Sequence, residues 1–294
     1  MPAALPDPGS VRHPQPSLSL NPNAPVLPQL LDSVVLAACE AQKAFADRYL
    51  SLGEWGADLS EQRFWMEGGG VRAEFLPFFV GSAAGGSDSW MWGWNNINEF
   101  PQPVVAIAQD VLAFGEHVQE PLLTVAQLPL SPAARAEQGL PQPPSDLDLQ
   151  QVLVWAAAAL SGIAAPVWYR GDTGPGSYAW FLLANPAEFS LPPATVLPTI
   201  SAITEALGMG AIGNGARALE AYAARRDGVT LHADPNSEGL LLRTTDGDVV
   251  VEVDELGRIV RVQATAGAVP SAAPAPTAPS PERAKGWLGK LFGR

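Results

Sequence analysis

The sequence contains little of what marks several familiar classes of protein. Its only cysteine is Cys39, which excludes an internal disulfide framework and fits a reducing cytoplasm. Lys and Arg number 17 against 30 Asp and Glu, and the resulting net charge of −13 argues against a nucleic-acid partner, because phosphate contacts need a basic surface. No apolar run reaches the roughly 18 residues of a transmembrane helix, and the first residues lack the basic start and apolar stretch of a secretory signal peptide. We therefore expect a cytoplasmic protein.

Known catalytic and metal-binding motifs are also missing. The histidines are isolated, with no Cys/His cluster, so no zinc site is predicted at His13, His117 or His232. There is no Gly-x-Ser-x-Gly elbow and no Walker loop. Three glycines at 208, 210 and 213 match GxGxxG, but a helix-like run precedes them where a dinucleotide site needs a strand. The sequence thus assigns no catalytic residue, no metal and no cofactor.

The most distinctive feature that is present is a run of tryptophans at every second position, Trp90, Trp92 and Trp94. In a β-strand this spacing puts all three indoles on one face, about 6.8 Å apart. Their burial would contribute at most about 11–19 kcal/mol of transfer free energy. Gly93 predicts that another part of the chain packs close to the backbone at that point.

Two interpretations of this strand stay open. If it is buried, it forms the core against which helices pack. If it is partly exposed, its indoles stack on a sugar or a base while amides bind the ligand, and the candidate ligand-binding residues are Trp90, Trp92, Trp94, Asn96 and Arg170. Nearby acidic residues allow a polar, enzyme-like site or simply a solvated surface; they are Asp88, Glu99, Glu116 and Asp172.

Hydrophobic periodicity predicts an α+β protein, in which antiparallel sheets from hairpins and a C-terminal meander pack with about five helices. Helices are expected at residues 27–50, 104–117, 147–161, 196–207 and 216–226. Strands are expected at 55–59, 63–66, 71–80, 90–95, 167–170, 178–183, 229–232, 239–244, 249–254 and 258–263. The loop over 131–146 is rich in Pro, Ala and Gln, which indicates an exposed insertion.

Proline-rich segments predict the domain limits. Residues 1–28 have eight prolines and no apolar period, which indicates a disordered arm, and residues 266–280 form a Pro/Ala linker. The folded α+β domain is expected over 29–265, with a C-terminal sub-domain from about residue 195 as an option. Residues 281–294 follow as a separate amphipathic peptide.

The pattern Trp90-x-Trp92-x-Trp94-x-Asn96 resembles the hallmark of a bacterial family of unknown function. The Tyr169-Arg170-Gly171 hairpin and the closing meander resemble the same family, and the resemblance extends over about 30–263. It implies domain limits only, because no activity is assigned to the family.

The peptide at 281–294 carries the most specific functional prediction. Its apolar side chains follow a helical period while its net charge is +3, and the residues expected to bind a partner are Trp287, Leu288, Leu291 and Phe292. Three surfaces suit it: a protein partner's hydrophobic groove, an anionic membrane, or the chain's own acidic body. We therefore expect a non-enzymatic binding module with a tethered recognition peptide. The alternative is an enzyme or a sugar or nucleotide binder with a site beside residues 90–98.

Overall fold

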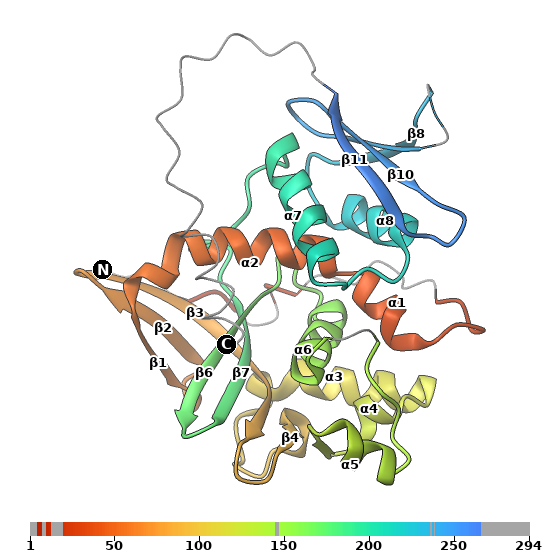
Figure 1. Ribbon diagram of the computed structural model, residues 1–294. Coiled ribbons are helices and arrows are strands. Elements are labelled where there is room, and N and C mark those ends of the chain that lie inside the picture. Colours follow the sequence, from red (N-terminus) through yellow and green to blue (C-terminus); the bar gives the residue numbers. More distant parts are fainter. Residues whose placement is uncertain are drawn as a thin grey trace.

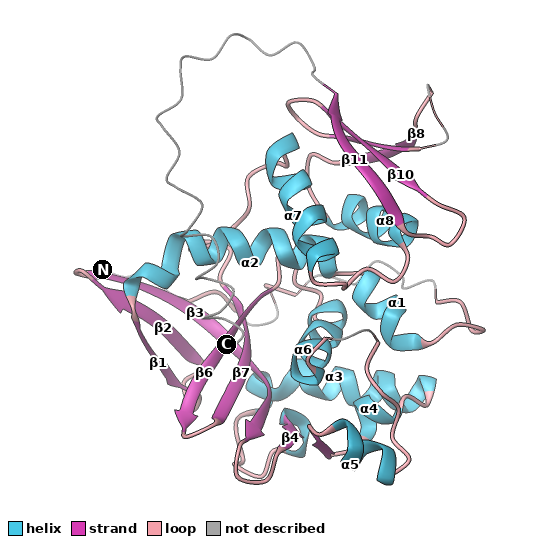
Figure 2. Ribbon diagram, viewed as in Figure 1, coloured by secondary structure: helices cyan, strands magenta, loops and turns pink. Residues whose placement is uncertain are grey.

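The computed structural model describes residues 5–7, 10–12, 20–144, 147–235, 237 and 239–265. It confirms the α+β class: two antiparallel sheets lie at opposite sides of the molecule, with helices between them (Figure 2). The larger sheet has seven strands and the smaller has four. Among the described residues, no helix combines the length and apolar character that crossing a membrane requires.

The seven-stranded sheet is organised around one long strand, β3 (Val71–Ala84). The strands around it are β1 (Glu54–Asp58), β2 (Arg63–Gly68), β4 (Ser89–Trp92), β5 (Gln127–Pro129), β6 (Val167–Gly174) and β7 (Ser177–Ala184). The order is β1-β2-β3-β4-β5, and β7 also pairs with β3 and carries β6. Every pair is antiparallel, as the hairpin turns predicted.

Both faces of β3 are buried, because apolar side chains point to each of them. Phe75 and Phe79 belong to one hydrophobic cluster, whereas Phe78 and Val80 belong to another. Among the described strands, only β7 pairs with the part of β3 that contains Pro77. Proline has no backbone N–H, and here no strand on the other side of β3 needs one. A bulge follows between Phe79 and Gly81.

The described chain forms six α-helices between residues 26 and 160 (Figure 1). They are α1 (Val26–Asp32), α2 (Val35–Tyr49), α3 (Gln102–Val118), α4 (Pro121–Thr124), α5 (Pro132–Glu137) and α6 (Leu149–Leu160). α6 is buried at every position except Gln150, since it is apolar around its whole circumference. The single helix predicted over 27–50 is wrong in one respect: it breaks at Ser33 and Val34, where the Ser33 hydroxyl donates to the Leu30 carbonyl, 2.7 Å away.

The remaining part consists of α7 (Val196–Gly208), α8 (Gly215–Arg225) and the meander β8 (Thr230–Ala233), β9 (Leu240–Arg243), β10 (Asp248–Val253) and β11 (Ile259–Thr265). Its sheet is separate from the larger one, in the order β11-β10-β9-β8. Its core is not separate, because Leu219 and Leu242 belong to the same hydrophobic cluster as Trp92. A buried ion pair, Arg226 to Glu40 at 2.7 Å, also joins it to α2.

Two predicted loop segments contribute to the core instead. In the arm predicted to be disordered over 1–28, Val11 is 3% exposed and the Arg12 guanidinium donates to the Ser161 carbonyl at 3.0 Å. α1 also begins inside that arm, at Val26. In the predicted insertion over 131–146, Arg135 is 2% exposed, and its guanidinium donates to two backbone carbonyls. The predicted linker and peptide, 266–294, lie outside the described residues.

Candidate functional site

The tryptophan run lies in the core. β4 ends at Trp92, and Gly93–Asn95 form a short 3₁₀ helix, so only two of the three indoles share the strand face. Trp90 is 0% and Trp92 is 1% exposed, and their rings meet edge to face with centroids 5.5 Å apart. Trp94 is half-buried against the same cluster. The buried interpretation therefore describes this strand.

Two glycines make this packing possible. A Cβ on Gly81, which lies opposite Trp92 on β3, would sit 2.5 Å from the Trp90 ring. A Cβ on Gly93 would sit 2.5 Å from the Phe79 carbonyl oxygen. Both distances are far shorter than a carbon atom tolerates, so each glycine is required by a close approach. The second confirms the prediction made for Gly93.

The two buried indoles differ in their hydrogen bonding. The Trp92 Nε1 donates to the Leu122 carbonyl at 3.0 Å, which ties β4 to α4. The Trp90 Nε1 is buried with no hydrogen-bond partner. The same ring type is thus anchored at one position and only packed at the other.

Asn96 shapes a turn instead of facing a ligand. It has left-handed backbone angles, with φ of 34°, and its side-chain amide donates to the Phe100 carbonyl while its amide oxygen accepts from the Phe100 N–H, both at 2.9 Å. The side chain is therefore occupied, and its effect is to hold Phe100 in place.

Arg170 lies apart from the tryptophan strand. Its guanidinium stacks on the Tyr178 ring, 4.4 Å from the centroid, and lies 5.8 Å from the Trp180 ring. Pairing registers place Arg170, Trp180, Gly81 and Trp92 in one row across the sheet. The row covers three strand spacings, so the backbones of Arg170 and Trp92 are about 14 Å apart. The five predicted ligand-binding residues thus do not surround one cavity, and their ligand-binding role stays a prediction.

A different cavity lies on the opposite face of the sheet, and we call it the aromatic hollow. It measures about 490 Å³, and its lining includes the rings of Trp55, Phe79, Phe100 and Phe181 and the polar side chains of Ser82, Asn98 and Thr173. β1, β3, β6 and β7 supply most of these residues, and the turn that Asn96 shapes supplies Asn98 and Phe100. These strands gather on one side of the molecule (Figure 1).

The hollow exists because five strands curve into an incomplete barrel. β1 and β6 are the two ends of the order β1-β2-β3-β7-β6, yet Trp55 of β1 meets Tyr169 of β6 with ring centroids 5.4 Å apart. The Trp55 ring also covers Gly171 so closely that a Cβ there would sit 2.4 Å from it. Glycine at 171 therefore lets the ends of the sheet approach, and the curvature leaves a cavity at the open end.

The rings of the hollow are held by one another. Phe79 meets Phe100 edge to face at 5.3 Å and Phe181 at 5.7 Å. Trp55 stacks on Phe64 at 5.8 Å with planes 16° apart. Ring contacts of this kind fix side chains with few rotatable bonds, so the lining is formed before any ligand arrives.

The polar side chains of the hollow remain available. Within the part of the chain that the structure describes, Ser82, Asn98 and Thr173 make no side-chain hydrogen bond. None of the described residues in the lining carries a charge. Behind Trp55, burial raises the pKa of Tyr169 to about 12, so this phenol is also neutral at physiological pH. The hollow therefore suits a neutral ligand that presents a flat face and hydroxyl or amide groups.

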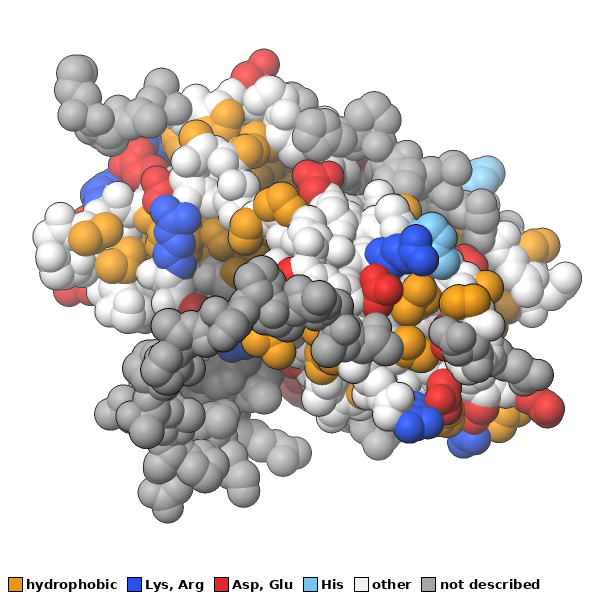
Figure 3. Space-filling view, turned by 90° about the horizontal axis from the view of Figure 1, so that it is seen from above, with side chains coloured by type: hydrophobic (Ala, Val, Ile, Leu, Met, Phe, Trp, Pro, Cys, Tyr) orange, Lys and Arg blue, Asp and Glu red, His pale blue; other side chains and the backbone are white. Residues whose placement is uncertain are grey.

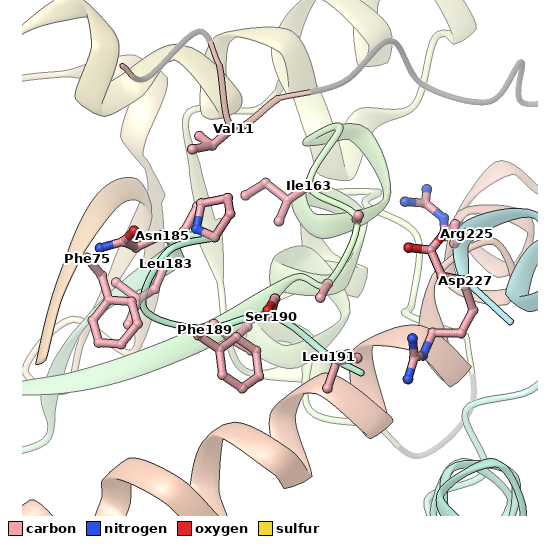
Figure 4. Close-up of a pocket in the computed structure, with 16 residues that line it drawn as sticks. Val11, Phe75, Ile163, Leu183, Asn185, Phe189, Ser190, Leu191, Arg225 and Asp227 are labelled. Atoms are coloured by element: carbon pink, nitrogen blue, oxygen red, sulfur yellow. The ribbon is translucent and has the colours of Figure 1, made fainter. Parts of the chain in front are cut away.

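A second pocket, of about 180 Å³, lies between the end of β7 and the end of α8 (Figure 4). Phe75, Leu183 and Phe189 line one side of it, and Arg225 and Asp227 lie at the other. Its arginine is already engaged: the Arg225 guanidinium donates to the Ser33 carbonyl at 2.7 Å, and burial lowers its pKa. This contact joins α8 to the end of α1.

The glycine-rich segment around 208–213 binds a carboxylate of the chain itself. Asp32 of α1 accepts hydrogen bonds from the backbone N–H groups of Gly213 and Asn214 and from the Arg217 guanidinium. These backbone amides lie at the N-terminus of α8, a position that favours a negative charge. The Asp32 side chain fills that place, which agrees with the predicted break between two helices.

A family model for a family of unknown function, DUF6882, matches residues 28–186. The chain belongs to this family. The predicted membership of a family of unknown function is confirmed, over 28–186 where the predicted resemblance extended over about 30–263. Neither the search of curated proteins nor the search of solved structures returned a match.

The matched range separates the two cavities. Every residue that lines the aromatic hollow lies between Trp55 and Phe181, inside the DUF6882 region. The pocket of Figure 4 draws on Val11 before that region and on Arg225 to Asp227 after it. The hollow is thus a cavity that the family domain builds from its own strands and turns.

The sequence contained part of the signal for the hollow. Phe79 lies in the strand predicted over 71–80, and Asn98 lies in the segment 90–98 beside which the alternative site was predicted. Trp55 and Thr173 had no motif around them, because they reach the hollow only when β1 curves towards β6.

Proposed function

We propose that this DUF6882 protein is a non-enzymatic binding module that holds a small neutral ligand, a sugar or a nucleobase, in the aromatic hollow. The observation that carries the proposal is the lining itself: four aromatic rings beside three neutral polar side chains without partners. The single buried cysteine, Cys39, supports a location in the reducing cytoplasm.

The dimensions and chemistry of the hollow support this class of ligand. Small-molecule pockets measure about 300–1,000 Å³ and are mostly apolar with a few placed polar groups. Stacking of a base on an aromatic side chain contributes about 1–3 kcal/mol. Ser82 and Asn98 supply both donors and acceptors for ring substituents. A phosphate would meet no cation in the lining, so a nucleoside is favoured over a nucleotide.

The packed tryptophan face supports binding away from the Trp strand. An enzyme that used Arg170 with carboxylates beside Trp92 would need these groups to converge on an open cavity. Instead, Trp92 is covered, and the Asp172 carboxylate accepts from the Gly174 N–H at 2.9 Å within its own turn.

Titration calorimetry of the full chain against neutral monosaccharides, nucleosides and the matching nucleotides tests the proposal. We expect a nucleoside or a monosaccharide to bind and its phosphorylated form to bind more weakly. Trp55→Ala should weaken binding by about 1–3 kcal/mol, or roughly 5- to 150-fold.

Trp65→Ala is the matched control. Trp65 lies on the neighbouring strand β2 and is half-buried like Trp55, but its ring stacks with the Arg72 guanidinium at 4.4 Å on the outer side of the sheet. It should leave affinity unchanged. Equal losses from both variants, or no binding by any neutral ligand, would contradict the proposal.

A further inference from the structure

A second surface is open between α2 and α7, and we call it the α2–α7 groove. It measures about 380 Å³. Ala44 and Ala202 are small residues along it, and the thiol of Cys39 is buried beneath. Leu197 stands at its edge with 77% of its surface exposed, the most exposed of the large hydrophobic side chains in the described part of the chain. Such a side chain beside an apolar groove indicates a surface that another segment covers.

The groove has an acidic end. Asp47 of α2 and Glu205 of α7 face it together with Lys43, which pairs with Asp47 at 3.3 Å. The carboxylate of Glu40 also lines it, but that charge is balanced by Arg226 at 2.7 Å. Two carboxylates against one ammonium leave a net charge of −1 at this end. A basic, amphipathic segment is complementary to this arrangement.

The chain carries such a segment at residues 281–294. Its apolar residues recur at a helical period, and its four basic residues against Glu282 leave a net charge of +3. An isolated helix of fourteen residues with three glycines is marginal in water, so an apolar surface is what would stabilise a helix of this sequence. An aromatic side chain inserted into a groove is a common way for such a helix to bind.

The tether also reaches the groove. The described chain stops at Thr265 in β11, and β11 packs against α7, which forms one wall of the groove. α7 is 13 residues long, or about 20 Å. The 15 residues from 266 to 280 span up to about 46 Å when extended. Figure 3, which looks down on the side where α7 lies, shows hydrophobic patches with acidic side chains beside them.

We propose that residues 281–294 dock in the α2–α7 groove of the same chain, with their apolar stripe on Ala44, Ala202 and Leu197 and their basic side chains towards Asp47 and Glu205. The proposal is independent of the aromatic hollow. A tethered segment competes at an effective concentration of about millimolar, so a contact whose Kd lies well below that concentration keeps the groove occupied.

Disulfide trapping in the full chain tests the docking. The variant Leu197→Cys with Ala284→Cys, a position on the apolar stripe, should form an intramolecular bond under mild oxidation, mapped by peptide mass spectrometry. Leu197 is exposed, so the substitution is compatible with folding.

The control pairs Ala284→Cys with Val260→Cys. Val260 is 60% exposed and lies on β11, the strand from which the tether starts, so a free tether would favour it over position 197. We expect trapping at 197 to be at least about tenfold faster than at 260, because docking raises the local concentration above that of the tether alone. Glu205→Lys with Asp47→Lys should slow trapping at 197 and leave 260 unchanged.

Three outcomes would overturn the proposal. Equal rates at 197 and 260 would mean that the segment does not dock. Bonds between two chains would assign the groove to a second copy. No trapping at 197, together with sedimentation on vesicles of 3:1 phosphatidylcholine and phosphatidylserine that Trp287→Ala with Leu291→Ala abolishes, would assign the segment to an anionic membrane.

Discussion

Replacement of Trp92 tests how the fold is held at its centre. The side chain is 1% exposed, meets Trp90 edge to face, and donates its indole N–H to the Leu122 carbonyl. Trp92→Ala removes the ring and leaves that carbonyl without its donor. We expect the variant to lose much of the stability of the domain.

The magnitude follows from burial and hydrogen bonding. A tryptophan buries at most about 250 Å², which at about 25 cal/mol per Å² sets a ceiling near 6 kcal/mol. Measured large-to-small substitutions of this type cost about 3–5 kcal/mol. Loss of the hydrogen bond alone, with most of the ring retained, costs about 1–3 kcal/mol when the partner stays buried.

Two conservative variants separate the contributions. Trp92→Phe loses ring volume and the bond to Leu122, whereas Trp90→Phe loses similar volume and no bond, since the Trp90 Nε1 has no partner. Trp92→Phe should therefore cost about 1–3 kcal/mol more than Trp90→Phe. Urea unfolding followed by circular dichroism measures all three free energies of unfolding.

One result would refute this reasoning. If Trp92→Ala unfolded within about 1 kcal/mol of the unmodified protein and instead lost a ligand, the tryptophan strand would be a binding site after all. Ligand binding in the aromatic hollow should survive Trp92→Phe, because that ring lies on the other face of the sheet.

Two further predictions concern buried charge and pH. Arg226→Ala should cost about 3–5 kcal/mol in urea unfolding, because it leaves the Glu40 carboxylate buried without its cation, and Arg226→Met with Glu40→Leu should recover most of that loss. Stability should fall as the pH rises from about 10 towards 12: burial raises the pKa of Tyr169 from 10.0 to about 12, so in this range the unfolded chain releases a proton that the folded chain keeps. Melting temperatures between pH 9 and 11.5 should show the fall, and Tyr169→Phe should make it less steep; an unchanged slope would contradict the assignment to this phenol.

Several elements were predictable because their signals are local. Hydrophobic periodicity predicted antiparallel hairpins and a C-terminal meander, and both are present in the two sheets. The prediction over 27–50 was correct in type, but the helix breaks at Ser33, whose hydroxyl donates back to the Leu30 carbonyl. Hydrophobic periodicity contains no information about such a side-chain bond.

An error occurred where a mainly polar segment contains one side chain that is buried. The segment over 131–146 looked like an exposed insertion, yet the buried Arg135 donates to the carbonyls of Pro129 and Leu130 and to the Gln142 side chain. Val11 lies within the arm predicted to be disordered, and its side chain is buried in a pocket between β7 and α8. Composition describes the average of a segment and misses one side chain that finds a buried place.

By itself, then, the sequence determined the α+β class, most strands and helices, and the family. These follow from hydrophobic period and turn residues, which act over a few positions. Only the tertiary structure decided that Trp90 and Trp92 are core, that Asn96 holds Phe100, and that a hollow lies on the other face. That hollow depends on the curvature of the sheet, which brings β1 close to β6. The approach requires contacts such as that of Trp55 with Gly171, two residues more than a hundred positions apart in the sequence.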